Sequence, residues 1–174
     1  MNDLKNHVRN IPDFPKKGIV FRDITTLIGH PESFAKVIDN FYNRYKDKKI
    51  DHIVCVESRG FIFGAPLAYK LNAGIIPVRK KGKLPHEILS ATYELEYGQD
   101  VLEVHKDCLK KDEKIVIVDD LLATGGTTKA VIDLMTKLNA HIIEIAYLIE
   151  LEFLKGRDKL DNYPIHSIVK YDSG

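Results

Sequence analysis

Four short apolar runs, each rich in β-branched residues, recur along the chain and alternate with segments of helical periodicity. We expect these runs to be strands, and they are Ile50–Val56, Gly74–Val78, Ile115–Val118 and Ile142–Ile149. Their apolar residues are mostly consecutive rather than alternate, so both faces of the sheet must be covered. The pattern therefore predicts an α/β fold in which helices flank a central, mostly parallel sheet.

The segments between the runs supply the helices. From Pro31 to Tyr45 the apolar residues follow the spacing of one helix face, and proline suits the first helical position. A second helix is expected from Gly60 to about Leu71, and a third over Thr127–Leu138. Each helix lies between two expected strands, as a doubly wound sheet requires.

Two segments depart from this alternation. Leu89–Glu94 and Val101–His105 alternate polar and apolar residues around a turn, which predicts a β-hairpin. We expect it to project as a flexible arm over about residues 80–106, where it can cover a site. Residues 1–30 hold one short apolar run and two prolines, and we expect an irregular, extended entry segment there. Residues 1–174 are predicted to form a single domain.

Length and charge narrow the class of protein. A chain of 174 residues buries an ordinary core without metal or disulfide support. Basic residues number 26 against 25 acidic ones, a net charge of +1, so no strong field favours nucleic acid as a partner. Cys55 and Cys108 lie far apart and outside any zinc-ligand spacing, so we predict reduced thiols and no protein metal site. No secretory signal or membrane-length apolar run is found, and we expect a cytoplasmic protein.

The segment Val116–Thr128 carries the strongest chemical signal. An apolar strand leads into Asp119 and Asp120, and two glycines with flanking threonines then open a helix. Glycines let several backbone N–H groups converge, and a helix N-terminus attracts anions, so this loop can hold a phosphate. Carboxylates at the carboxyl end of a parallel strand can accept hydrogen bonds from a sugar diol. The sequence lacks a P-loop and a dinucleotide fingerprint, and a phosphorylated ribose fits best.

This segment resembles the phosphoribosyl-pyrophosphate motif of the type I phosphoribosyltransferases. Further segments resemble the adenine-specific members of that family in the same order along nearly the whole chain. They are Phe21–Ile24, Glu57–Phe61, Arg79–Pro85, Tyr93–Gly98 and Leu154–Arg157. The chain departs from the pattern at Glu57, where an aspartate is usual, and this change is conservative. The resemblance implies the type I phosphoribosyltransferase fold, with a small N-terminal hood over residues 1–30 and the projecting arm over about residues 80–106.

The resemblance also implies an activity: transfer of 5-phosphoribose from 5-phosphoribosyl 1-pyrophosphate to N9 of adenine. The products are AMP and pyrophosphate, and the reaction serves purine salvage. Mg²⁺ is implied as a cofactor held mainly by the pyrophosphate, the ribose hydroxyls and waters. Family members are usually homodimers, so a homodimer is expected, with neither nucleic acid nor membrane as a partner.

Site residues follow from the same resemblance. Arg59 and Glu96 are implied to be catalytic, Arg59 by gripping pyrophosphate and Glu96 by acid–base work near N7 of adenine. A cis peptide bond is implied near Glu57–Ser58. The residues implied to bind substrates are Val20, Phe21, Arg22, Ser58, Arg59, Lys80, Lys83, Tyr97, Asp119, Asp120, Ala123, Thr124, Gly125, Gly126 and Thr127.

The hood is implied to select the base. Backbone groups of Val20–Arg22 would read the edge of adenine, whose N6 donor and N1 acceptor are reversed in hypoxanthine. Phe21 either stacks on the base or fills the hood core, and the sequence leaves both open. Two other functions remain as alternatives: a transferase for hypoxanthine, guanine or xanthine, and a regulator that binds phosphoribosyl pyrophosphate without turning it over.

Overall fold

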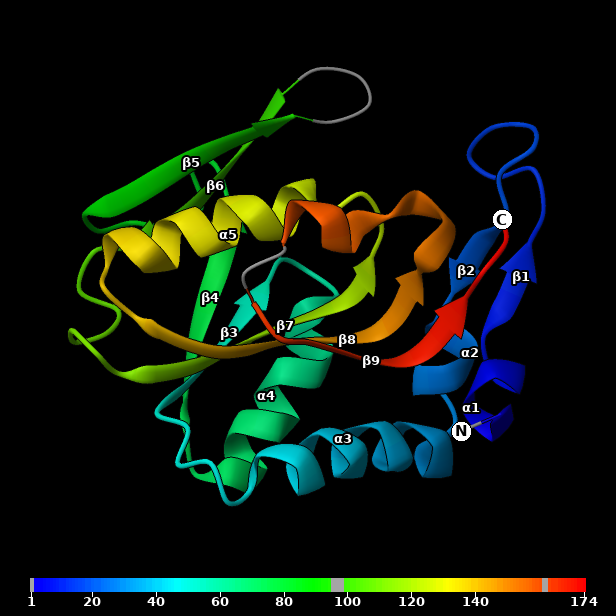
Figure 1. Ribbon diagram of the computed structural model, residues 1–174, viewed down its shortest axis with the longest axis horizontal. Coiled ribbons are helices and arrows are strands. Elements are labelled where there is room, and N and C mark those ends of the chain that lie inside the picture. The colour runs from blue at the N-terminus through cyan, green and yellow to red at the C-terminus, as the bar shows by residue number, and fades with distance from the viewer. Residues whose placement is uncertain (1, 95–98, 161–162) are drawn as a thin grey trace.

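The computed structural model describes residues 2–94, 99–160 and 163–174, and a seven-stranded sheet forms the centre of this part (Figure 1). The strand order is β5-β6-β4-β3-β7-β8-β9. In chain order the strands are β3 (His52–Val56), β4 (Gly74–Lys80), β5 (Ile88–Glu94), β6 (Gln99–His105), β7 (Lys114–Leu122), β8 (His141–Leu151) and β9 (Ile165–Tyr171). The run β4-β3-β7-β8-β9 is parallel throughout, which confirms the predicted mostly parallel sheet.

Helices cover both faces of this sheet. Helices α3 (Pro31–Tyr45) and α4 (Gly60–Leu71) lie on one face and α5 (Gly126–Lys137) on the other (Figure 1). Each of the three begins and ends within one residue of its predicted bounds. None of the helices in the described residues is long and apolar enough to cross a membrane.

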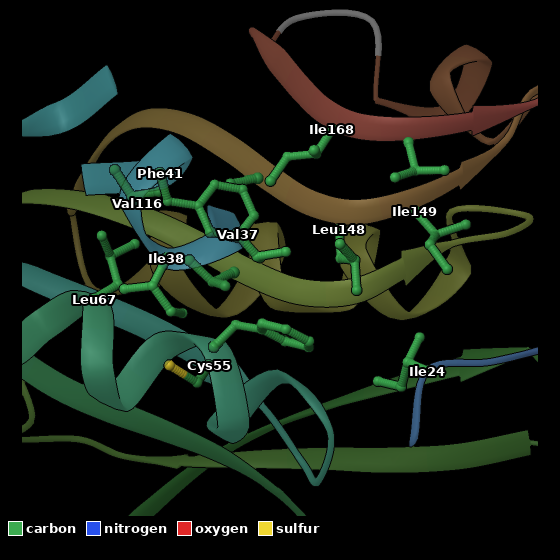
Figure 2. Packing of buried hydrophobic residues seen from close by; sticks show 14 of the residues in the cluster. Ile24, Val37, Ile38, Phe41, Cys55, Leu67, Val116, Leu148, Ile149 and Ile168 are labelled. Atoms are coloured by element: carbon green, nitrogen blue, oxygen red, sulfur yellow. The ribbon is translucent and has the colours of Figure 1, made fainter. Parts of the chain in front are cut away.

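On the central strands β3 and β7, alternate buried residues belong to two separate cores. On β3, Ile53 and Cys55 pack under α3 and α4, whereas Val54 and Val56 pack under α5. Figure 2 shows the first core, in which Phe41 of α3 lies close to the sheet. The side chains of β3 are therefore apolar at consecutive positions because each face of the strand meets a helix layer.

The N-terminal segment forms the hood. It contains α1 (Asn2–Asn6), β1 (Arg9–Ile11), β2 (Phe21–Asp23) and α2 (Thr25–Ile28). β1 and β2 pair antiparallel as a separate two-stranded sheet, and the C-terminus of the chain lies beside it (Figure 1). The buried Asp23 accepts hydrogen bonds from Arg9 Nε at 2.9 Å and from the Thr25 N–H at 2.9 Å, so it ties β1 to the start of α2.

The predicted hairpin arm is confirmed as β5 and β6, which pair antiparallel. β6 extends the main sheet by pairing with the end of β4, where Arg79 lies opposite Glu103 and Lys80 opposite Leu102. The hairpin lies over α5 at one edge of the molecule (Figure 1). Its base is therefore joined to the last residues of β4, the strand that leads into the lysine-rich residues 80–83, called here the basic turn.

Two features of the sheet differ from the sequence prediction. β9 was not predicted, because its residues show neither a continuous apolar run nor a strict alternation: two polar residues, His166 and Ser167, precede the apolar pair Ile168 and Val169. β7 does not end at the acidic pair but runs on to Leu122. Its pairing with β3 stops at Val118, so beyond this point only β8 supports it. Asp119 and Asp120 thus lie just beyond the last pairing of β7 with β3, at the carboxyl end of β3.

Candidate active site

A cavity of about 590 Å³ lies at the carboxyl ends of β3 and β7. This is the edge at which parallel sheets of this kind bind ligands. Eight of the residues predicted to bind substrate line it, and they are Ser58, Arg59, Lys80, Lys83, Asp119, Asp120, Ala123 and Thr127. The strand topology therefore brings together residues that the sequence separates by up to 69 positions, from Ser58 to Thr127.

A smaller hollow of about 70 Å³ adjoins this cavity at the start of α5. It is formed by the loop between β7 and α5, and Thr124, Gly125 and Gly126 line it together with residues of the main cavity. Gly125 precedes the first residue of α5 and has a φ of +80°, a conformation that disfavours other residues. The loop therefore presents the helix N-terminus to the hollow, as an anion site requires.

The two acidic residues occupy different environments within the cavity wall. Asp120 is buried and ion-paired, with its Oδ2 2.8 Å from Arg59 Nε. Asp119 lines both hollows, and its Oδ1 accepts a hydrogen bond of 2.8 Å from the Asp120 N–H. Burial and the neighbouring Asp120 raise the pKa of Asp119 well above its usual range. Burial raises the pKa of Asp120 as well, although the Arg59 guanidinium offsets part of this effect. A cation or hydroxyl donors placed beside these carboxyls would favour their ionised forms.

Arg59 lies in a short loop between β3 and α4 that packs tightly against β7. The peptide bond between Glu57 and Ser58 is cis, as the resemblance implied. A Cβ on Gly60, the first residue of α4, would lie 2.9 Å from the Val118 carbonyl oxygen and 3.1 Å from Asp119 Oδ1. Glycine thus lets α4 begin directly against β7, and this places Arg59 beside Asp120.

Glu57 organises the basic turn, a role that the sequence prediction did not assign. It accepts hydrogen bonds from Arg79 Nε at 3.2 Å, from the Lys80 N–H at 3.0 Å and from Lys83 Nζ. Burial raises the pKa of Glu57, but these hydrogen bonds dominate and lower it to about 2. Glu57 is therefore ionised, and it joins β3 to the basic turn, which carries Lys80 and Lys83, both predicted to bind substrate.

Lys80 has its own carboxylate partner on the arm. Its Nζ lies 3.2 Å from Asp100 Oδ2, and Asp100 accepts a further hydrogen bond of 3.2 Å from the Tyr93 hydroxyl. Tyr93 and Asp100 lie opposite each other on β5 and β6. The base of the arm thus contributes one cation and one phenol to the cavity, and only the cation was predicted.

In the described residues neither Arg22 nor Phe21 of the hood lines either hollow, but Phe21 lies near Arg59. Its ring is half-buried, packs edge-on against Phe14 at 5.3 Å and lies 5.9 Å from the Arg59 guanidinium. This position favours a ring at the cavity mouth over one in the hood core. Arg22 turns its side chain away, donating to Asn10 Oδ1 at 2.7 Å and to the Ser173 carbonyl at 3.0 Å.

The remaining predicted residues are placed as follows. Val20 is half-buried just before β2 and lines neither hollow among the described residues. Glu96 and Tyr97 lie outside the described residues.

Comparison with known protein families is decisive for the fold and the reaction class. Residues 23–170 match the family model of the phosphoribosyl transferase domain. The chain belongs to the phosphoribosyl transferase family. An adenine phosphoribosyltransferase of Trichlorobacter lovleyi is 54% identical over 171 residues, which are 98% of this chain and 100% of the relative. The resemblance seen in the sequence is therefore confirmed, and this phosphoribosyl transferase is an enzyme of the adenine-specific group.

Solved structures of phosphoribosyl transferases agree with this fold. The adenine phosphoribosyltransferase of Thermoanaerobacter pseudethanolicus superposes with a TM-score of 0.93 at 50% identity, covering 98% of this chain and 99% of that one. The Saccharomyces cerevisiae enzyme, solved with an iminoaltritol bisphosphate and adenine, has a TM-score of 0.91 at 43% identity and covers 96% and 97%. The predicted type I phosphoribosyltransferase fold is thus confirmed.

Proposed function

We propose that the cavity at the ends of β3 and β7 transfers 5-phosphoribose from 5-phosphoribosyl 1-pyrophosphate to N9 of adenine, giving AMP and pyrophosphate. One observation carries the assignment of roles. The cavity joins a cationic wall, Arg59 with Lys80 and Lys83, to a wall made of two carboxyls and a glycine-rich helix N-terminus. A ligand with a pyrophosphate at one end, a diol in the middle and a phosphate at the other end matches this order of groups.

Departure of pyrophosphate is the difficult step, and the cationic wall serves it. The anomeric carbon acquires oxocarbenium character as the bond to pyrophosphate breaks, and negative charge collects on the leaving group. Arg59 can bind that charge through two parallel N–H groups, and Lys80 and Lys83 add point charges. Ser58 lines the cavity beside Arg59 and is suited to contact the same group.

The opposite wall holds the phosphoribosyl group in place. Asp119 and Asp120 accept hydrogen bonds from the ribose hydroxyls, and the loop from Ala123 to Thr127 binds the 5-phosphate with backbone N–H groups and threonine hydroxyls. Because these contacts fix the sugar relative to the base, the anomeric carbon of the ribose is held in position for attack by N9 of adenine.

The residues present fit a Mg²⁺ ion that arrives with the substrate. No group of three His, Cys, Asp or Glu side chains lies together in the parts of the chain that the structure describes. Asp119 and Asp120 offer hard carboxylate oxygens in the cavity wall, and Mg²⁺ commonly takes one or two carboxylates together with phosphates and waters. When bound, the ion neutralises part of the charge on pyrophosphate.

Adenine enters between the hood and the cavity. In the described residues β2 pairs only with β1, so backbone groups on its other edge are available to read the base. Phe21 stacks at this mouth, and Glu96 on the arm balances charge near N7 as the N9 proton leaves. We infer that Tyr97 contacts the bound substrates. We further infer that residues 1–174 act as one domain, in a cytoplasmic homodimer.

Nucleotide formation by the purified protein tests the proposal directly. The protein, Mg²⁺ and phosphoribosyl pyrophosphate are incubated in parallel with adenine, hypoxanthine, guanine or xanthine. AMP alone is the expected product, because a mismatched base leaves hood groups unpaired. A nucleotide of another base would overturn the specificity, and binding of phosphoribosyl pyrophosphate without any product would support the regulator instead.

A further inference from the structure

The loop assigned to the 5-phosphate rests on a segment that the mechanism does not use. This segment follows β8 and contains two short 3-10 helices, η1 (Glu152–Leu154) and η2 (Gly156–Lys159). A Cβ on Gly125 would lie 2.5 Å from the Gly156 carbonyl oxygen. In the other direction, a Cβ on Gly156 would overlap the carbonyl oxygen of Ala123. The two backbones are therefore in close contact, and neither loop has room to move towards the other.

An ion pair with a buried glutamate fixes this segment to the sheet. Arg157, the residue after Gly156, binds Glu150 of β8 through both Nε and Nη2, at 2.5 and 2.7 Å. Nη1 of the same guanidinium donates to the Ile165 carbonyl at 3.3 Å, at the start of β9. Glu150 is 2% exposed and lies opposite Leu122, the last residue of β7 before the phosphate loop. The guanidinium therefore connects η2 to two strands directly behind that loop.

We propose that Arg157 and Gly156 are positioning residues for the 5-phosphate. Arg157 fixes η2 on β8 and β9, and the Gly156 backbone then holds Ala123 and Gly125 in the curve that directs their N–H groups into the small hollow. The inference rests on the proposed function, since it concerns the same phosphate loop. The inference predicts a selective effect. Disrupting the contacts of Arg157 or Gly156 should lower the affinity for ligands that carry a 5-phosphate but not the affinity for pyrophosphate, which binds at the opposite wall.

The chain contains a matched control for this ion pair. Arg44 binds Glu144, also on β8, through Nε and Nη2 at 2.5 and 2.6 Å. The side chains of this pair are 38% and 4% exposed, against 39% and 3% for Arg157 and Glu150. Each glutamate also has a lysine at about 4 Å, Lys48 in one case and Lys170 in the other. The Arg44 pair, however, joins α3 to β8 and lies outside both hollows in the described residues.

The experiment compares Arg157→Lys with Arg44→Lys. Lysine keeps the charge but loses the bidentate geometry, so both variants lose similar amounts of stability. Dissociation constants are measured by calorimetry for AMP, ribose 5-phosphate and pyrophosphate, with the urea midpoint of each protein recorded alongside. Arg157→Lys is expected to raise the dissociation constants of AMP and ribose 5-phosphate by about tenfold or more and to change that of pyrophosphate by less than about twofold. Arg44→Lys is expected to leave all three dissociation constants unchanged.

The outcomes separate the inference from the proposed function. If the parent protein binds neither AMP nor ribose 5-phosphate, the proposed function itself fails. If the parent binds them and both variants do so equally well, or if Arg157→Lys weakens pyrophosphate as much as AMP, the positioning role is refuted and the pair is only structural.

Gly156→Ala supplies a second variant should Arg157→Lys fold poorly. Its added methyl pushes directly on Ala123 without removing any charge. The KM for phosphoribosyl pyrophosphate is expected to rise about tenfold or more while the KM for adenine stays within about twofold. Equal changes in both constants would contradict a role confined to the phosphate loop.

Discussion

Glu57→Gln removes one charge from the centre of the basic turn while keeping the size of the side chain. In the parent, the Glu57 carboxylate accepts hydrogen bonds from Arg79, from the Lys80 N–H and from Lys83. The amide has one acceptor oxygen in place of two, and its NH₂ group faces cations that have no acceptor to offer. The substitution therefore tests whether this carboxylate holds the turn to β3.

The expected loss of stability follows from the pKa of Glu57. Lowering it from 4.5 to about 2 would be worth at most about 3 kcal/mol, at about 1.4 kcal/mol for each pKa unit. Its partners are well solvated, however, because the side chains of Lys83 and Arg79 are 45% and 33% exposed. Solvent screening reduces the gain, and we expect the free energy of unfolding to fall by about 1–2 kcal/mol in Glu57→Gln.

The pH dependence has a defined sign. The folded-state pKa of Glu57 is depressed, so its stabilisation is fully present above pH 4.5 and is lost as the pH falls from there towards about 2. The difference between parent and Glu57→Gln should therefore be largest near neutral pH and should narrow clearly by about pH 4. A group whose pKa was raised in the folded protein would show the opposite trend.

Urea unfolding of both proteins, at several pH values between about 7 and about 4, measures this difference. Glu87→Gln is the matched control, because the Glu87 side chain is 71% exposed and forms only a surface pair with Lys106. The control should change the free energy of unfolding by less than about 0.5 kcal/mol. The reasoning is refuted if Glu57→Gln is as stable as the parent at neutral pH, or if the difference widens as the pH falls.

Three further substitutions test the site. Arg59→Ala should lower kcat by about 10²-fold or more in steady-state assays, because the leaving pyrophosphate loses its guanidinium, and a fully active variant would remove that role. Gly125→Ala should cost about 1–2 kcal/mol or more in urea unfolding and raise the KM for phosphoribosyl pyrophosphate, since φ is +80° and the methyl would meet Gly156; an unchanged protein would show that the loop adapts freely. Glu96→Gln should lower kcat by about 10²-fold at saturating substrates, and unchanged turnover would contradict acid–base work there.

Much of the fold was predictable because its strands are covered on both faces. Consecutive apolar residues such as Ile115–Val118 occur where helices pack against each side of a strand, and Figure 1 shows that arrangement. β9 lies at the edge of the sheet and pairs with β8 alone, so its sequence needs no continuous apolar run. The continuation of β7 to Leu122 was missed because its last residues, past Val118, are paired on one side only.

The site was predictable where one loop carries the chemistry and was not where residues meet through space. The acidic pair and the glycines of the phosphate loop are adjacent in the sequence, so their types and order indicated a phosphorylated sugar. Glu57 and Arg79 are 22 positions apart, and only the parallel pairing of β3 with β4 brings them together. The contact of Gly125 with Gly156 likewise depends on the path of the chain after β8.

The pairing of Arg59 with Asp120 has a consequence for which anions the site accepts. Arg59, Lys80 and Lys83 each have an internal carboxylate partner: Asp120, Asp100 and Glu57. A small anion such as inorganic phosphate must displace a carboxylate to bind Arg59, and it leaves Asp120 buried without a partner. A molecule that presents pyrophosphate to Arg59 and hydroxyls to Asp120 gives each residue a new partner in place of the ion pair. The pairing of Arg59 with Asp120 thus favours a ligand that carries both a pyrophosphate and hydroxyl groups over inorganic phosphate alone.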